Sequence, residues 1–203
     1  LRNGPQELVA AELVPVAVRT GVIAAVDAWV LRRCIAILAE RRRRGEPLRL
    51  FASQSLQGWS DIERFAALQA ALADTDVPAG ALVMEFRAEE VRHNMRVLVG
   101  LAENLRRANI GLSLAGVDAD ALAAGWIDHL PLDYVKLAPE LDDATLASVI
   151  DTIHTRGIKA IAPCVESRAE VARLRAADVD LLQGNYFRSP AEDLGEPLVQ
   201  VET

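Results

Sequence analysis

Residues 110–137 read IGLSLAGVDADALAAGWIDHLPLDYVKL, and this stretch indicates the class of fold. It opens on the apolar run Ile110–Leu114 and closes on a second run, Tyr134–Leu137. Both runs are nearly continuous in apolar residues, which is typical of strands that are buried on both faces of a parallel sheet. The 24 residues between the two starts leave room for the crossover that parallel strands require.

The same alternation extends outward in both directions along the chain. Further apolar runs lie at Leu48–Ala52, Ala81–Phe86, Ile158–Ala162 and Leu181–Leu182. Between the runs, apolar residues recur at helical spacing: Val22, Ile23, Val26, Trp29, Val30, Cys34 and Leu38; Phe65, Leu68 and Leu72; Val91, Met95, Leu98 and Leu101; Leu146, Val149, Ile150 and Ile153; and Val171 and Leu174. Repetition of strand and helix at this period predicts a parallel α/β fold.

Two parallel α/β architectures compete, the open doubly wound sheet and the (βα)8 TIM-like barrel. The sequence has neither a GxGxxG dinucleotide fingerprint nor a GxxxxGK[ST] phosphate loop, which weakens the first. Six strands can be counted, whereas a barrel has eight in about 250 residues. The chain also starts at Leu1 without a methionine. We therefore expect residues 1–203 to be one barrel domain that lacks its N-terminal strands and belongs to a longer multidomain protein.

The composition limits the classes of function. Of the 203 residues, 51% are hydrophobic and 25% are charged, so a core can be buried without disulfide bonds. Cys34 and Cys164 lie too far apart in the sequence for a CxxC metal pair. The formal net charge of −7 argues against non-specific nucleic-acid binding, which requires a basic face. The sequence contains no run of 18 uncharged apolar residues, so it does not predict a membrane-spanning helix.

The chemistry of a βα barrel is located at the carboxyl ends of its strands. The residues at these positions are Ser53, Ser55, Glu85, Ala115, Gly116, Lys136, Pro163, Glu166 and Gln183. They are enough for a charged binding site but few for hydrolysis with two metal ions. Structural explanations also exist, since Glu85 can cap a loop and Lys136 can extend to solvent. The three histidines, His93, His129 and His154, lie on or near predicted helices without the spacing of metal ligands.

Taken together, several segments resemble the EAL domain, the family that binds and hydrolyses the bacterial second messenger cyclic di-GMP. The matching segments are Leu1–Arg2 (end of Glu-Ala-Leu-Leu-Arg), Leu13–Ile23 (Phe-Ile-Pro-x-Ala-Glu-x-x-Gly-x-Ile, with Val18 for the glutamate), Leu130–Lys136 (Leu-Pro-x-Asp-x-x-Lys), Val165–Ser167 (Val-Glu-Thr), and Gln183–Phe187 with Pro190 (Gln-Gly-Tyr-x-Phe and a proline). The resemblance implies a βα barrel with one antiparallel strand. Its first two strands, and the Glu-Ala-Leu motif itself, would precede Arg2.

The departures from the family pattern concern its metal ligands. Ser53 stands at the asparagine of Val-Asn-Leu-Ser, Glu85 and Ala88 stand at the two glutamates of Leu-Glu-Ile-Thr-Glu, Ala115 and Gly116 stand at the paired aspartates of Asp-Asp-Phe-Gly, and Pro163 stands at the first glutamate of Ala-Glu-Gly-Val-Glu. Paired Mg²⁺ or Mn²⁺ ions require carboxylate and amide oxygens, most of which these substitutions remove. We therefore expect no metal site, no catalytic residues and no phosphodiesterase activity.

The resemblance implies that the domain is retained as a metal-independent receptor for cyclic di-GMP, with no other cofactor. The residues that would bind the nucleotide are Arg2, Glu85, Lys136, Glu166, Gln183, Phe187 and Pro190. Arg2 would contact a phosphate, and Lys136, which faces less compensating anion once the acidic residues are lost, would attract a phosphate better than it would serve a metal site. Phe187 and Pro190 would offer an apolar surface to a guanine, although core packing explains Phe187 equally well.

Two alternatives remain beside the receptor, a protein-interaction scaffold that has lost the nucleotide and an active phosphodiesterase with a rebuilt metal site. The resemblance extends to inactive EAL domains that control type IV pili through a PilZ-domain protein, so a PilZ-domain partner and a bacterial cytoplasmic, polar location are expected. It also allows a homodimer, which many members of the family form. Nucleic-acid binding is not expected.

Overall fold

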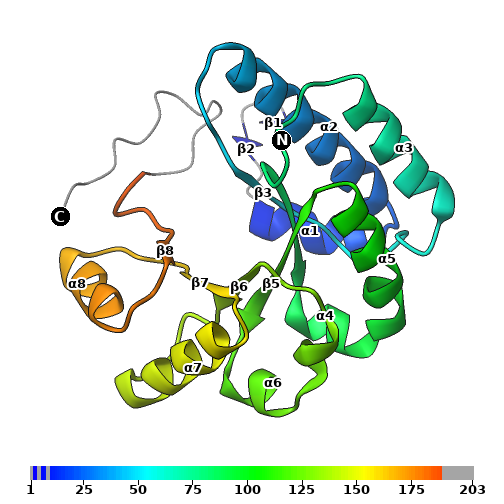
Figure 1. The fold of residues 1–203 in the computed structure, drawn as a ribbon. Coiled ribbons are helices and arrows are strands. Elements are labelled where there is room, and N and C mark those ends of the chain that lie inside the picture. The colour runs from blue at the N-terminus through cyan, green and yellow to red at the C-terminus, as the bar shows by residue number, and fades with distance from the viewer. Residues whose placement is uncertain (1, 4–5, 8–9, 189–203) are drawn as a thin grey trace.

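The computed structural model describes residues 2–3, 6–7 and 10–188, with side chains described from Leu13 onward except at residue 62. Six parallel strands form the central sheet: β3 (Leu50–Ser53), β4 (Leu82–Arg87), β5 (Gly111–Val117), β6 (Tyr134–Leu137), β7 (Lys159–Ala162) and β8 (Leu181–Leu182). Figure 1 shows them side by side, with helices along the sheet. The six predicted strands are therefore confirmed, two of them with the predicted bounds.

Helices form where the periodicity predicts them, with one exception, and further helices form at 10–19, 119–123 and 126–129, where none was predicted. They are α1 (Ala10–Arg19), α2 (Ile23–Arg43), α3 (Ile62–Ala73), α4 (Ala88–His93), α5 (Met95–Arg107), α6 (Ala119–Ala123), the 3₁₀ helix η1 (Trp126–His129), α7 (Asp143–Thr155) and α8 (Arg168–Ala176). The prediction of one helix through Val91 and Met95 is wrong, because the chain leaves helical geometry at Asn94 (φ −135°, ψ 35°).

The strand order decides between the two architectures that the sequence left open. Each strand pairs with the next one along the chain, in the order β3-β4-β5-β6-β7-β8. A doubly wound sheet would instead reverse its order at a switch point. The consecutive order is that of a βα barrel, and the described strands form an arc of one.

The two faces of the sheet carry different side chains, because successive residues of a strand point to opposite sides. Leu82, Met84 and Phe86 of β4 face the helices and are fully buried in the main hydrophobic core. The opposite, inner face has a small cluster of Val83, Tyr134 and Ile161. The inner face therefore has an apolar floor, and polar side chains follow it toward the carboxyl ends of the strands.

Two aspartates secure the amino ends of neighbouring strands. Asp133, the aspartate of the Leu-Pro-x-Asp-x-x-Lys segment, precedes β6 and accepts a hydrogen bond from the Leu112 backbone N–H of β5 at 2.9 Å. Asp180 precedes β8 and accepts one from the Ala160 N–H of β7 at 2.8 Å. His154 also contacts Asp180, at 2.9 Å from its Nε2 atom. These contacts give Asp133 and His154 structural roles at the end of the sheet opposite to the expected site.

The amino-terminal part of the chain forms a separate hairpin. Strand β1 (Arg2–Asn3) pairs antiparallel with β2 (Gln6–Glu7), and neither strand pairs with the six-stranded sheet. The backbone of Arg2 is thus placed in β1, whereas its side chain lies outside the described part of the structure. Pro190 also lies outside the described residues. No described helix has the length and apolar character needed to cross a membrane.

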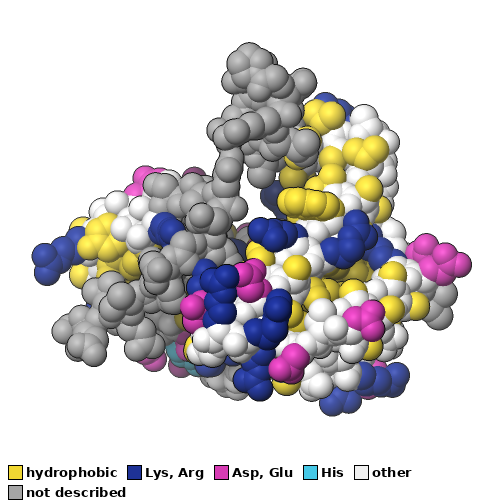
Figure 2. Space-filling view, turned by 90° about the horizontal axis from the view of Figure 1, so that it is seen from above, with side chains coloured by type: hydrophobic (Ala, Val, Ile, Leu, Met, Phe, Trp, Pro, Cys, Tyr) yellow, Lys and Arg dark blue, Asp and Glu magenta, His cyan; other side chains and the backbone are white. Residues whose placement is uncertain are grey.

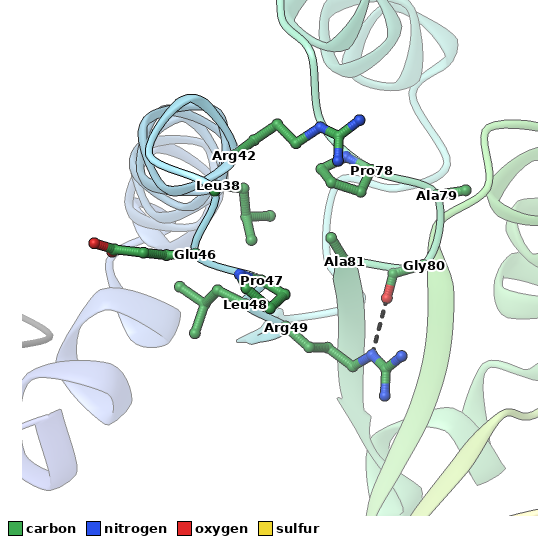
Figure 3. A pocket seen from close by; sticks show the side chains of 11 residues that line it. Leu38, Arg42, Glu46, Pro47, Leu48, Arg49, Pro78, Ala79, Gly80 and Ala81 are labelled. Atoms are coloured by element: carbon green, nitrogen blue, oxygen red, sulfur yellow. Dashed lines mark hydrogen bonds between the residues drawn. The ribbon is translucent and has the colours of Figure 1, made fainter. Parts of the chain in front are cut away.

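Lys and Arg side chains are exposed, with Asp and Glu among them, at the end of the molecule where the strands begin. Figure 2 looks down on the end of the molecule where α2 finishes, and Lys and Arg side chains gather near its centre. A cavity of about 400 Å³ lies between the end of α2 and the start of β4, with Arg42 and Arg49 on its border. In Figure 3 the Arg49 side chain donates from Nε to the Gly80 carbonyl, at 3.0 Å. The cavity is far from the carboxyl ends, where the site is expected.

Candidate functional site

A row of polar side chains crosses the inner face at the carboxyl ends of the strands. Ser53 of β3 pairs in register with Glu85 of β4, which pairs with Ser113 of β5. Because paired residues in a parallel sheet point to the same side, the three side chains meet. The Ser53 hydroxyl donates to Glu85 Oε1 at 3.2 Å, and the Ser113 hydroxyl donates to Glu85 Oε2 at 3.5 Å. Glu85 is therefore the centre of the row.

A buried ion pair joins Glu85 to Lys136 of β6. The Lys136 Nζ atom lies 2.8 Å from Oε1 and 2.7 Å from Oε2 of Glu85. The side chains of Lys136 and Glu85 are only 15% and 6% exposed. The idea that Glu85 caps a loop is wrong, as is the idea that Lys136 extends to solvent. The compensating anion that remains for Lys136 is Glu85, and both of its carboxylate oxygens neutralise the lysine.

The residues around this pair do not fit the two divalent cations that the EAL resemblance implies. Ala115 lies beside Lys136 in register, and Gly116 forms a bulge with φ +76°, so neither offers a side-chain oxygen. Pro163 offers none at the end of β7. The Glu85 carboxylate is bound to an ammonium group, which a cation would have to displace. Within the described residues, no group of three His, Cys, Asp or Glu side chains could hold a metal ion.

The second half of the candidate site is made by two loops that contact each other closely. The Val165 N–H donates to the Gln183 carbonyl at 2.9 Å, and the Tyr186 N–H donates to the Val165 carbonyl at 3.0 Å. A Cβ atom built on Gly184 would lie 2.1 Å from the Val165 carbonyl oxygen. Only glycine allows this approach, which explains physically why the Val-Glu and Gln-Gly segments occur together.

Glu166 projects from the loop after β7 and is exposed. The loop itself is held by Glu170 of α8, whose Oε2 atom accepts from the Glu166 N–H at 2.8 Å and the Ser167 N–H at 2.9 Å. Ser167 is the N-cap of α8 and completes a capping box with Glu170. The hydrogen bond from the Glu166 N–H, followed by that from the Ser167 hydroxyl, lowers the pKa of Glu170 below its ordinary value.

The two aromatic residues after β8 have different surroundings. Phe187 is half-buried and packs against the main core, so core packing accounts for it. Tyr186, which the sequence reasoning did not select, is 45% exposed and meets Phe187 edge to face, with 5.3 Å between ring centroids. Gln183 is exposed nearby. Cys164 is exposed and has φ +59°, a left-handed conformation at the position of the glycine in Ala-Glu-Gly-Val-Glu.

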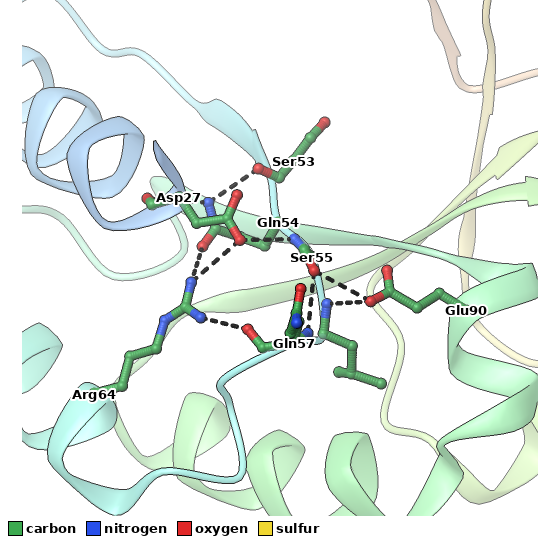
Figure 4. Close-up of polar contacts among 8 residues, drawn as sticks. Asp27, Ser53, Gln54, Ser55, Gln57, Arg64 and Glu90 are labelled. Atoms are coloured by element: carbon green, nitrogen blue, oxygen red, sulfur yellow. Dashed lines mark hydrogen bonds and ion pairs between the residues drawn. The ribbon is translucent and has the colours of Figure 1, made fainter. Parts of the chain in front are cut away.

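The structure also contains a buried polar cluster that the sequence reasoning missed. It fixes the loop that follows β3, where Asp27 of α2 accepts from the Ser55 N–H at 3.0 Å and from Arg64 Nη2 at 3.2 Å (Figure 4). On the other side of the loop, Glu90 of α4 accepts from the Leu56 N–H at 2.7 Å and from the Ser55 hydroxyl at 3.2 Å. Glu90, in the first turn of α4, therefore positions this loop.

Burial dominates the electrostatics of this cluster. It raises the pKa of Asp27, and the hydrogen bonds from Ser55 and Arg64 oppose that shift only in part. Arg64 stacks on the Trp59 ring, with 4.2 Å between its guanidinium carbon and the ring centroid. Asp27 and Arg64 form a buried structural ion pair, since the Arg64 side chain is only 12% exposed. The pair fixes the loop after β3 at the edge of the site. The only sequence signal that could have indicated this cluster is Asp27, an acidic residue inside the apolar pattern of a predicted helix.

The comparisons with known proteins agree with this geometry. Residues 2–190 match the family model of the EAL domain. The chain is 30% identical over 195 residues to the cyclic di-GMP phosphodiesterase PA2567 of Pseudomonas aeruginosa, a match that covers 89% of this chain and 32% of that protein. Overall, the chain spans about a quarter to a third of the length of the curated relatives it matches.

Solved structures show the same fold. A FimX EAL domain superposes with a TM-score of 0.88 at 23% identity, over 95% of this chain and 81% of that one. The FimX EAL domain from Pseudomonas aeruginosa bound to c-di-GMP superposes with a TM-score of 0.83 at 23% identity, over 92% of this chain and 78% of that one. The sheet of six consecutive parallel strands is thus an arrangement found in EAL barrels.

Proposed function

The chain belongs to the EAL-domain family, and from this premise we propose that it is a cyclic di-GMP receptor that holds the nucleotide without hydrolysing it. Curated relatives are cyclic di-GMP phosphodiesterases, and a FimX EAL domain with the same fold has been solved with the nucleotide bound. Both facts support cyclic di-GMP as the ligand. The proposed loss of hydrolytic activity rests on the residues of this chain alone.

The single observation that carries the proposal is the Glu85–Lys136 ion pair. Hydrolysis of a phosphodiester at neutral pH needs an activated hydroxide and a positive charge for the oxyanion, which two divalent ions provide in this family. Here Glu85, the carboxylate retained at the centre of the row, is bound to an ammonium group on both oxygens. Its neighbours Ser53, Ala115 and Gly116 add no charge that would draw a cation into the site.

Binding does not require the lost carboxylates. Cyclic di-GMP carries two phosphodiester charges, so an inner face with fewer anions repels it less. Glu166 and Gln183 lie on the two interlocked loops at the edge of the site, where their exposed polar groups can reach a ligand. Arg2 is proposed as a phosphate contact through its resemblance to the family arginine. Hydrogen bonds and charge pairing, without metal ions, then hold the nucleotide.

The test is calorimetric titration of the purified chain with cyclic di-GMP in EDTA, followed by chromatography of the nucleotide after incubation with Mg²⁺ or Mn²⁺. We expect saturable heat in EDTA and recovery of intact cyclic di-GMP in both metals. Absence of heat at tens of micromolar protein would contradict the receptor and favour a scaffold. Conversion to linear pGpG would contradict the loss of catalysis and establish a phosphodiesterase.

We further propose that the bound state is read by a protein partner. The resemblance to inactive EAL domains of type IV pilus regulators, the FimX type, makes a PilZ-domain protein the expected partner and the bacterial cytoplasm, at a cell pole, the expected location. A pull-down of purified PilZ-domain protein by this chain, with and without cyclic di-GMP, tests the partner. Capture that depends on the nucleotide supports it, and no capture in either condition contradicts it.

A further inference from the structure

Arg87 is the last residue of β4 and follows Glu85 on the same face of the strand. Phe86 between them faces the helices and is fully buried, so Glu85 and Arg87 both point to the inner face. In register, Arg87 pairs with Ala115, and Ala115 pairs with Lys136. Arg87 and Lys136 therefore flank a small residue, about 10 Å apart at their Cα atoms if each strand spacing is about 4.8 Å.

The charges of these two residues are in different states. Lys136 is buried and neutralised by Glu85. Arg87 is exposed, and no described carboxylate or carbonyl forms an ion pair or hydrogen bond with its side chain. This guanidinium has no partner in the described part of the chain, and it stands two residues beyond Glu85 as a positive charge at the mouth of the site. Arg87 stands at the threonine of the EAL motif Leu-Glu-Ile-Thr-Glu, so this chain has a positive charge where that motif has a neutral residue.

We infer that Arg87 is a phosphate-binding residue that supplies, in place of divalent cations, positive charge for one phosphodiester of the cyclic dinucleotide. Ala115 and Gly116 leave the floor beside it free of side-chain carboxylates. A planar guanidinium donates two parallel hydrogen bonds to the two non-bridging oxygens of a phosphodiester. The inference rests on the proposed function, and it identifies which group takes over the electrostatic role of the metals.

The experiment compares cyclic di-GMP affinity, by calorimetry in EDTA, among the wild-type chain, Arg87→Gln, Arg87→Lys and Arg87→Thr. Loss of a charge-assisted bidentate contact weakens binding about 10- to 100-fold, so Arg87→Gln and Arg87→Thr should fall by that factor. Arg87→Lys keeps the charge without the fork and should fall less. The affinity of Arg87→Gln should also depend less steeply on salt than that of the wild type, a change that a merely structural role would not cause.

The matched control is Arg32→Gln, which removes the same charge from an exposed arginine on α2. It should bind as the wild type does, and the thermal midpoints of all variants should stay close together because Arg87 has no partner to lose among the described residues. Equal affinity of Arg87→Gln and wild type would overturn the role of Arg87 and leave the receptor intact. An equal loss in Arg32→Gln would likewise overturn it, as a general charge effect. Absence of binding by the wild type would overturn both proposals.

Discussion

At the scale of single residues, the site is defined by where Glu85 and Lys136 place their charges. Both residues were predictable as site residues, because each is a charged residue near the end of an apolar run and the carboxyl ends of parallel strands converge. Their direct pairing was not predictable, since the two residues are 51 positions apart in the sequence and their strands are separated by β5 in the sheet. Because of this contact, Lys136, which was expected to bind the nucleotide, belongs to an ion pair with no net charge.

The stability of this pair can be tested by removing one partner and then both. Lys136→Met should lower the free energy of unfolding by about 3 kcal/mol, because it leaves the Glu85 carboxylate buried beside only two hydroxyl groups. The double variant Glu85→Gln/Lys136→Met should regain at least half of that loss, since no buried charge remains. Urea unfolding measures both. A double variant less stable than Lys136→Met would show that the pair itself, and not an isolated charge, dominates.

At the scale of elements, the strands were predictable and the interruptions of helices were not. Buried parallel strands are short apolar runs, and all six were located because such runs stand out from the helical stretches around them. The break in the helix at Asn94 was not predictable because Val91, Met95 and Leu98 keep a helical spacing of three to four residues across it. The contact between the loops at Val165 and Gly184 was also not predictable, since a close backbone approach leaves no periodic pattern in the sequence.

That loop contact predicts a strong effect at Gly184 and an opposite one at a matched glycine. Gly184→Ala should lower the free energy of unfolding by at least about 2 kcal/mol, because its Cβ atom would overlap the Val165 backbone. Gly100→Ala, inside α5 with nothing within 4 Å of its Cβ position, should raise it by up to about 1 kcal/mol. Urea unfolding of the two variants checks this. Equal tolerance of both substitutions would contradict the interlocked loops.

A pH dependence follows from the capping box at the start of α8. The folded-state pKa of Glu170 lies below its ordinary value of 4.5, so its hydrogen bonds add stability above that value, and this stability is lost as the pH falls through the folded pKa. Glu170→Gln cannot titrate, so its stability should depend less on pH between about 5 and 3. Thermal midpoints of the two proteins across this range give the comparison. Parallel curves would exclude Glu170 as a contributor.

At the scale of the whole molecule, the consecutive strand order brings Ser53, Glu85, Lys136, Glu166 and Gln183 to one edge of a curved sheet. The sequence predicted which edge, through the rule that barrel chemistry lies at the carboxyl ends. It could not predict the buried cluster of Asp27, Arg64 and Glu90, because these three residues come from three helices and meet only in the folded chain. The carboxyl edge thus combines a rigid rim with a centre that lacks the acidic oxygens of a two-metal site.

The most direct measurement is an anomalous-scattering map of crystals grown with cyclic di-GMP and an excess of Mn²⁺. The account predicts intact nucleotide over the carboxyl ends of the strands and no manganese peak within coordination distance of Glu85, whose oxygens remain on Lys136. A pair of manganese peaks between Glu85 and the phosphodiester, with Lys136 turned away, would contradict it.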